Sequence, residues 1–170
     1  MDLGSADQAP GKPGRAAGAL ERFFGTVRNS LRFHGRTALP ELINYVLCVA
    51  FFHLGLGLLL MLGLSYPAFA AAQDLLQVLY FIPVPALLAR RLHDQDRSAK
   101  ILWLALPGVA LWLARKAIGY TQSSAVLVEL DRWTWPLDLA AGFASLGLII
   151  VLILPGTAGP NSFGPDPRSP

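Results

Sequence analysis

The sequence is poor in charged residues and in cysteine, and each shortage excludes a class of protein. Only 15% of its 170 residues are Asp, Glu, Lys or Arg, whereas a soluble domain usually has about 25%. These charges are confined to a few blocks, with long apolar runs between them. The single cysteine, Cys48, permits neither an intramolecular disulfide nor a cysteine-based metal cluster. The composition therefore indicates an integral membrane protein that forms one bundle of helices.

Motifs for catalysis and for nucleic-acid binding are missing too. The sequence has no Ser/His/Asp arrangement, no phosphate-binding glycine loop and no zinc motif. Many of its basic residues are grouped beside the apolar runs, where such residues contact anionic headgroups and fix the topology. Nucleic-acid binding would instead need a soluble basic face with a reading element. We therefore predict no catalytic residue, no cofactor, no metal and no nucleic-acid partner.

Four apolar stretches are predicted to span the membrane as helices. The first, residues 42–64, is uncharged and as a helix would cover about 34 Å, which exceeds a hydrocarbon core of roughly 30 Å. The second should kink near its end, because Pro83 and Pro85 interrupt the helical hydrogen bonds. The third is short, with a re-entrant segment as its alternative, and the fourth begins with Pro136, a residue favoured in the first helical turn. The predicted spans are residues 42–64, 68–89, 101–118 and 136–154.

The remaining segments are predicted to lie outside the membrane core. Residues 1–19 are rich in Gly, Ala and Pro without apolar periodicity, which predicts a disordered tail. Residues 20–33 place apolar side chains on one helical face, which predicts an amphipathic helix in the headgroup plane; a soluble helix packed on a partner is the alternative. Residues 119–135 are predicted to be a connection, and residues 159–170 a Gly/Pro-rich tail. The predicted fold is thus all-α, with a membrane domain over residues 20–158.

The distribution of basic residues predicts the orientation of the four spans. An even number of spans puts the residues before the first span, Arg90–Lys100 and the last tail on one side of the membrane. That side carries eleven Lys and Arg residues, and the other side carries three. Lys and Arg close to the spans are enriched on the cytoplasmic side. Both termini are therefore predicted to be cytoplasmic.

Three motifs make the chain resemble a known family of membrane proteins. The first is Phe33-His34-Gly35-Arg36, followed by Glu41 and Tyr45. The second is Arg90-Arg91-Leu92-His93-Asp94 with Arg97-Ser98, and the third is Pro155-Gly156-Thr157 with Gly159, Asn161 and Phe163-Gly164-Pro165-Asp166-Pro167. The chain resembles the YhaH-like small bacterial inner-membrane proteins, the domain of unknown function 805. The resemblance implies a bundle of about four spans in the bacterial inner membrane, and it implies no activity.

All three motifs fall at the same membrane face in this topology, so their charged residues are predicted to form a polar cap. One hypothesis is that the cap is internally satisfied, with the last tail folded back so that Asp166 accepts hydrogen bonds from Arg90 or Arg91. The other hypothesis is that the cap binds an anionic group, such as a lipid headgroup, through Arg90, Arg91 and Arg97. The candidate cap residues are Arg36, Arg90, Arg91, His93, Asp94, Arg97 and Asp166.

Polar side chains inside the spans are further candidates, because burying them in lipid is costly. His53, Asp74 and Gln77 are the candidate intramembrane polar residues, and His53 is predicted to hydrogen-bond to Gln77. Together with the proline-interrupted spans, they support the alternative hypothesis of a small transporter or channel subunit. The favoured hypothesis is a non-enzymatic inner-membrane protein whose cap binds anionic lipid headgroups or a membrane protein partner. A homo-oligomer and a membrane enzyme remain as further alternatives.

Overall fold

The computed structural model describes residues 15–168, and this part of the chain is built from helices without a strand. A short helix, α1 (Arg15–Arg28), comes first. The predicted all-α architecture, with four membrane-capable helices after a short one, is confirmed. Residues 1–14, which make up most of the predicted disordered tail, lie outside the described residues. The stretches long and apolar enough to cross a membrane are Leu39–Gly63, Tyr66–Asp94, Ala99–Thr121 and Ser124–Ile153.

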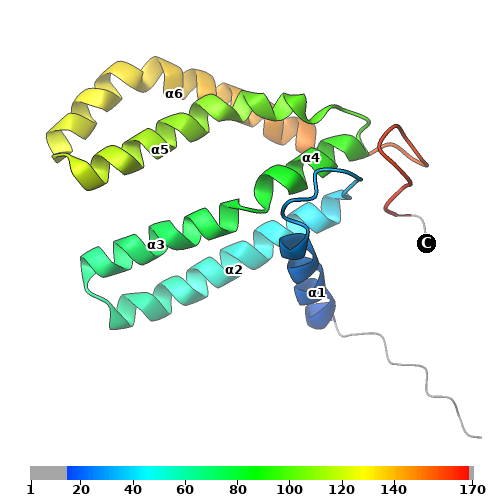
Figure 1. Ribbon diagram of the computed structural model, residues 1–170, viewed down its shortest axis with the longest axis horizontal. Helices are drawn as coiled ribbons and strands as arrows, with labels where there is room; N and C mark the ends of the chain where they lie inside the picture. Colours follow the sequence, from blue (N-terminus) through cyan, green and yellow to red (C-terminus); the bar gives the residue numbers. More distant parts are fainter. Residues whose placement is uncertain (1–14, 169–170) are drawn as a thin grey trace, which may run out of the picture.

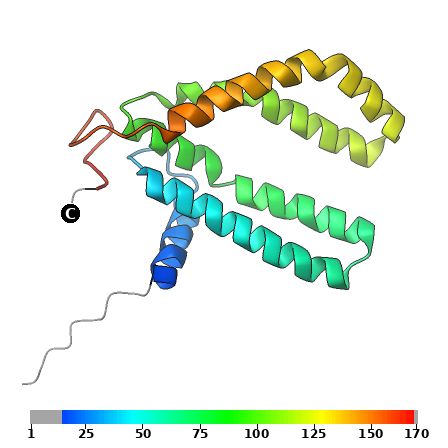
Figure 2. The same ribbon diagram turned by 180° about the vertical axis from the view of Figure 1, so that it is seen from behind.

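The helices form two antiparallel hairpins that meet at one end (Figure 1). Seen from behind, the hairpins diverge from a junction at which α1 and the C-terminal tail also lie (Figure 2). The connections at the far ends of the hairpins are short, so little of the chain lies beyond the spanning helices on that side. The first hairpin consists of α2 (Leu39–Gly63) and α3 (Tyr66–Phe81), the second of η1 (Ala99–Ala105), α5 (Leu106–Thr121) and α6 (Ser124–Ile153), and α4 (Val84–Asp94) joins them.

The buried core lies at this junction and not along the hairpins. Leu87 of α4 is fully buried and packs with Phe23 and Tyr45, while Leu92 of α4 packs with Leu148 and its neighbours on α6. No more than 17% of the most apolar window of any spanning stretch is buried inside the chain. Most apolar side chains of the hairpins therefore face outward, as expected of helices that lipid surrounds.

Helix α1 packs across the start of α2. The Phe23 ring stacks on the Tyr45 ring with 5.6 Å between centroids, and the Thr26 hydroxyl donates a hydrogen bond to Glu41 at 3.1 Å. Other apolar side chains of the same segment stay outside this contact, among them Phe24, which is 61% exposed, and Leu31, which is 84% exposed. Part of the apolar surface of the segment predicted to be amphipathic thus packs on α2, and the rest is exposed.

Three prolines shape the spanning helices. Pro83 lies between α3 and α4, so the predicted kink in the second span is present. Pro107 follows the change from the 3-10 helix η1 to α5, which together are long enough to span. The prediction for residues 119–135 is wrong: α6 begins at Ser124, and Pro136 lies inside it rather than in a first turn. Asp131, one of the charged residues of this segment, is tolerated in the helix because it pairs with Arg115 of α5 at 2.7 Å.

Candidate functional site at the junction of the hairpins

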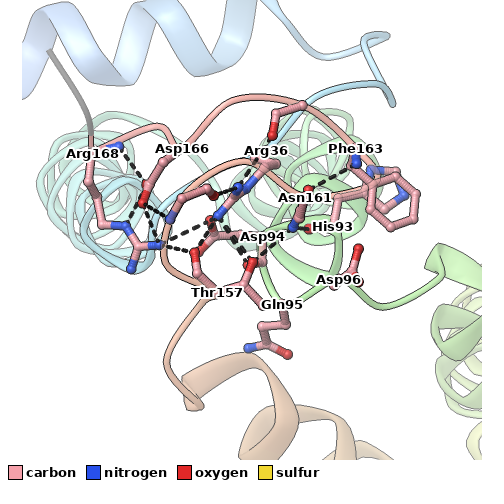
Figure 3. A network of polar contacts seen from close by, with 12 residues as sticks. Arg36, His93, Asp94, Gln95, Asp96, Thr157, Asn161, Phe163, Asp166 and Arg168 are labelled. Carbon is pink, nitrogen blue, oxygen red and sulfur yellow. Dashed lines mark hydrogen bonds and ion pairs between the residues drawn. The ribbon is translucent and has the colours of Figure 1, made fainter.

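Asp94, the last residue of α4, lies at the centre of the polar cap (Figure 3). Its Oδ1 accepts hydrogen bonds from Nε and Nη2 of Arg36 at 3.1 and 2.9 Å. Its Oδ2 accepts one from Nη1 of Arg91 at 2.6 Å. Each of these three side chains is only 1% exposed. A buried carboxylate needs such charge-assisted partners, but two guanidinium groups on one carboxylate leave a positive charge in excess.

Carbonyl oxygens at the end of α6 surround part of this positive charge. Arg91 donates from Nε to the Leu152 oxygen at 2.9 Å and from Nη2 to the Leu154 oxygen. Gln95 donates from Nε2 to the oxygens of Val151 and Leu154 at 2.6 and 2.9 Å. The last carbonyls of a helix have no partner within it and carry partial negative charge. Arg91 of α4 and Gln95, which follows α4, therefore cap the C-terminus of α6, and the carbonyl groups there stabilise the buried Arg91.

The C-terminal tail supplies the acceptors for Arg36. The Arg36 guanidinium donates to the backbone oxygens of Gly159 and Thr157 at 2.6 and 2.7 Å. The Thr157 amide in turn donates to the Asp94 backbone oxygen at 2.8 Å. The tail thus folds back onto the end of α4, as the hypothesis of an internally satisfied cap predicted.

His93 joins the tail to the segment before α2. The Phe163 ring stacks on the imidazole with 3.9 Å between centroids and 4° between planes. Asn161 donates from Nδ2 to the His93 backbone oxygen at 2.8 Å, and the imidazole Nδ1 lies 3.2 Å from the Gly35 oxygen. Figure 3 shows these side chains on the opposite side of Asp94 from Arg168. His93 is therefore held on both sides by packing and hydrogen bonds.

Gly156 is required by the close approach of the tail to Asp94. A Cβ atom at this position would lie 1.9 Å from Oδ2 of Asp94 and 3.0 Å from its backbone oxygen. The first distance is far inside van der Waals contact, and the carboxylate cannot move away because it is fixed by two arginines. Only glycine lets the chain leave α6 past the buried carboxylate.

The predicted pairing of Asp166 with Arg90 or Arg91 is wrong. Asp166 accepts hydrogen bonds from the Gly159 amide at 3.0 Å and from Nε of Arg168 at 2.7 Å. The hydrogen bond from Arg168 is the largest reason why the pKa of Asp166 is lowered to about 2. Arg91 is already bound by Asp94 and the α6 terminus, whereas Arg168 is only two residues away. Asp166 therefore pairs with its near neighbour in the sequence, Arg168.

A family model supplies the wider context for this cap. The model for a protein of unknown function (DUF805) matches residues 30–165 of the chain. The chain belongs to the DUF805 family. It is 29% identical over 154 residues to the inner membrane protein YhaH of Escherichia coli K12 and, to the same extent, of Escherichia coli O157:H7, which covers 88% of this chain and 98% of each relative. No solved structure matches the chain.

The segment Arg90–Asp94, which was predicted to follow the second span, belongs to the helix that ends this span. Residues Arg90–Asp94 form the end of α4 and are buried. Arg90 is 8% exposed, and its Nη2 has no hydrogen-bond partner among the described residues and lies 3.9 Å from Oε1 of Glu41. Arg97, in contrast, is exposed, and its side chain makes no hydrogen bond or ion pair within residues 15–168. The three candidate anion-binding arginines thus lie in three different environments.

A basic hollow lies beside α1 and was not among the predicted sites. It has a volume of about 800 Å³ and contains two arginines but no acidic residue. Its sequence signal was the placement of Arg28 and Arg32 off the apolar face of the segment, but only the folded chain shows that the end of α3 forms the opposite wall. The lining residues are Gly25, Val27, Arg28, Asn29, Ser30, Leu31, Arg32 and Ile82.

The predicted hydrogen bond between His53 and Gln77 is absent. Within the described chain, Nδ1 of His53 and Oε1 of Gln77 are both buried without a partner. The His53 ring instead makes an edge contact with Tyr80, with 5.9 Å between centroids. Asp74 accepts hydrogen bonds from Nζ of Lys116 at 2.5 Å and from the Tyr120 hydroxyl at 2.7 Å. It therefore ties the first hairpin to the second.

A second charged group was missed by the sequence analysis, because Asp138 stands alone near the start of the fourth predicted span. Arg115 of α5 donates to Asp131 at 2.7 Å, to Thr134 at 2.8 Å and to Asp138 at 2.9 Å. The signal for it was a lone Asp138 in the fourth apolar run. Among the residues that the structure describes, no group of three or more His, Cys, Asp or Glu side chains is arranged to hold a metal ion.

Proposed function

We propose that this DUF805 protein is a non-enzymatic protein of the bacterial inner membrane that binds the headgroup of an anionic phospholipid in the hollow beside α1. The observation that carries the proposal is the lining of this hollow, which pairs two arginines with apolar side chains and contains no acid. Basic side chains close to a membrane are attracted to anionic headgroups by about 1 kcal/mol each. The name of the E. coli relatives supports the inner membrane as the location.

The hollow suits an amphiphile because its two sides differ. Arg28 and Arg32 are exposed, so their guanidinium groups can donate to a phosphate. A guanidinium group binds a phosphate through two parallel hydrogen bonds. Leu31, which is 84% exposed, and Ile82, which is 52% exposed, offer apolar surface to the first part of an acyl chain. A headgroup at the arginines and a chain along the end of α3 would use both sides.

Arg90 strengthens the preference for an anion. Its guanidinium is nearly buried, and Glu41 at 3.9 Å is its one described ion-pair partner. The charge of Arg90 is close enough to that of Arg32 for the two to act on each other. Three positive charges with one carboxylate beside them favour negative charge in the hollow.

The buried part of the polar cap, around Asp94, has a structural role in this proposal. Arg36 and Arg91 have their donors occupied by Asp94 and by backbone oxygens. An anion could bind them only after these buried contacts were broken, which is costly. The internally satisfied cap therefore fixes the ends of α4 and α6. We assign lipid binding to Arg28 and Arg32 instead of Arg91.

Orientation and location follow from the same charges. In the topology predicted from the sequence, eleven of the Lys and Arg residues are assigned to the side of the cap and the hollow, against three on the other side, so we place this side and both termini in the cytoplasm. Anionic lipids of that leaflet would then be in direct reach of the hollow.

Native mass spectrometry tests the lipid-binding proposal. Full-length protein extracted gently and supplied with phosphatidylglycerol or phosphatidylcholine should retain the anionic lipid selectively. The double variant R28Q/R32Q should lose this retention, whereas the control R22Q/R97Q, which removes the same charge from exposed positions outside the hollow, should keep it. Equal retention by the two double variants, or equal retention of both lipids, would contradict the proposal.

The other hypotheses from the sequence stay predictions. A membrane protein partner, a homo-oligomer and a transporter or channel subunit each need evidence from a second molecule or from flux. Asp74 is bound by Lys116 and Tyr120, whereas Nδ1 of His53 and Oε1 of Gln77 have no partner among the described residues.

A further inference from the structure

The interface between α2 and α3 contains a group of buried hydrogen-bond acceptors without donors. Nδ1 of His53, Oε1 of Gln73 and Oε1 of Gln77 are all buried and have no partner within the described chain. Gln73 and Gln77 are one helical turn apart on α3, so their amides share one face. His53 lies on α2, and its ring touches Tyr80, three residues beyond Gln77. His53, Gln73 and Gln77 form a polar seam between α2 and α3.

The geometry of Gly57 shows how Gln73 is enclosed. A Cβ atom at Gly57 would lie 2.8 Å from Nε2 of Gln73, so the missing side chain gives the amide its room between the helices. Neither end of this amide makes a hydrogen bond in residues 15–168. Exchanging its oxygen and nitrogen would therefore not remove the deficit.

Unpaired polar groups at this depth require an explanation. In a hydrocarbon environment no outside partner can form hydrogen bonds with them. Burying each unpaired polar group therefore costs much more free energy than burying a leucine of similar size would. No side chain of residues 15–168 supplies a donor to these three atoms. Water does so in other buried polar sites, where one molecule makes about three hydrogen bonds and bridges groups that cannot meet directly.

We propose that the α2–α3 seam is a water-binding site. Water molecules donate hydrogen bonds to His53, Gln77 and Gln73 and link the two helices through them. Asp74, the neighbour of Gln73 on α3, has a side chain that is 26% exposed and is held by Lys116. The His53 imidazole is thereby in contact with water although it lies in the interior of a spanning helix.

Solid-state NMR on histidine-labelled, full-length protein in lipid bilayers tests this site. The chain has three histidines: His34 is exposed, His93 is stacked between protein groups, and His53 lies in the seam. Magnetisation transferred from water should reach the His53 ring at a rate comparable with that of His34. The H53F variant assigns the signal, and His93 provides the comparison for a ring enclosed by protein.

Variants of the two glutamines locate the water. Q73L/Q77L removes the acceptors with little change in volume, and transfer from water to His53 should be lost in it. The control Q122L makes the same chemical change at an exposed position outside the seam and should leave transfer unchanged. Absence of water transfer to His53 in the unmodified protein overturns the proposal, and so does full transfer in Q73L/Q77L.

Discussion

Replacing Asp94 with asparagine probes the centre of the cap while keeping its shape. Asparagine retains one oxygen, which can still accept from Arg36, but its amide nitrogen would face Nη1 of Arg91, a donor that now lies 2.6 Å from Oδ2. One charge-assisted hydrogen bond is lost outright and two are weakened. Two arginine side chains, each 1% exposed, are left without a counter-charge.

The expected loss is large for a single isosteric change. Removing one partner of a buried ion pair usually costs about 3–5 kcal/mol, and we expect D94N to lie in the upper part of this range because two cations lose their partner. Unfolding of the purified protein by SDS, followed by circular dichroism, measures the change. Hydrogen exchange should rise at the same time in residues 157–164, which depend on Asp94.

An exposed neighbour provides the control. Asp96 is exposed, and its described side-chain contact is a hydrogen bond from the Ser162 amide at 3.3 Å, so D96N should change stability by no more than about 0.5 kcal/mol. A change of that small size in D94N would refute the assignment of Asp94 as the centre of the cap. Replacing the whole group in R36L/R91M/D94L should recover part of the loss, because no buried charge then remains unpaired.

Three further changes test the docking of the tail. G156A places a methyl group against Asp94 and should destabilise the cap by about 1–3 kcal/mol or more, seen as faster proteolysis of the tail. F163A removes the ring stacked on His93 and should cost about 1 kcal/mol in the SDS titration. The pKa of Asp166 is lowered to about 2. The stabilisation of the docked tail by Asp166 should therefore be complete at a pH above the ordinary carboxyl pKa and be lost as the pH falls towards 2. Hydrogen exchange of the tail measures this loss.

Each of these predictions has a matched control. G147A adds a methyl group where no atom lies within 4 Å, and F24A removes a ring that is 61% exposed; both should leave the tail docked. D166N should make tail exchange insensitive to pH in the acid range. Equal proteolysis of G156A and G147A, equal stability of F163A and F24A, or an unchanged acid transition in D166N would each contradict the structural account.

Long apolar runs and prolines could be interpreted directly from the sequence. A run that exceeds the thickness of a bilayer has few folds available to it, because every backbone polar group must be paired inside the segment. The kink at Pro83 follows from the chemistry of a single residue. The start of the fourth helix was predicted too late because proline is favoured in the first helical turn. Pro136 instead lies inside one long helix, in which Asp131 and Asp138 accept hydrogen bonds from Arg115.

The cap could be located from the sequence but its contacts could not. Arginine next to aspartate is normally a solvated pair, and nothing in the segment itself shows that Arg91 and Asp94 are buried. Their burial depends on the end of α6 and on Thr157, which lies 63 residues beyond Asp94. The basic hollow depends in the same way on Ile82 lying opposite α1. Such contacts between distant segments require the folded chain.

The composition of the cap also sets an order of events during synthesis. Arg36 precedes the first spanning helix and Asp94 ends the second, whereas the carbonyl groups that complete the shell of Arg36 belong to Thr157 and Gly159. Residues 155–168 are translated after all four helices, so the shell can close only once all four helices have been synthesised. A chain that stalls or ends before Gly156 would present a buried arginine without its carbonyl acceptors, a defect that distinguishes incomplete molecules from finished ones.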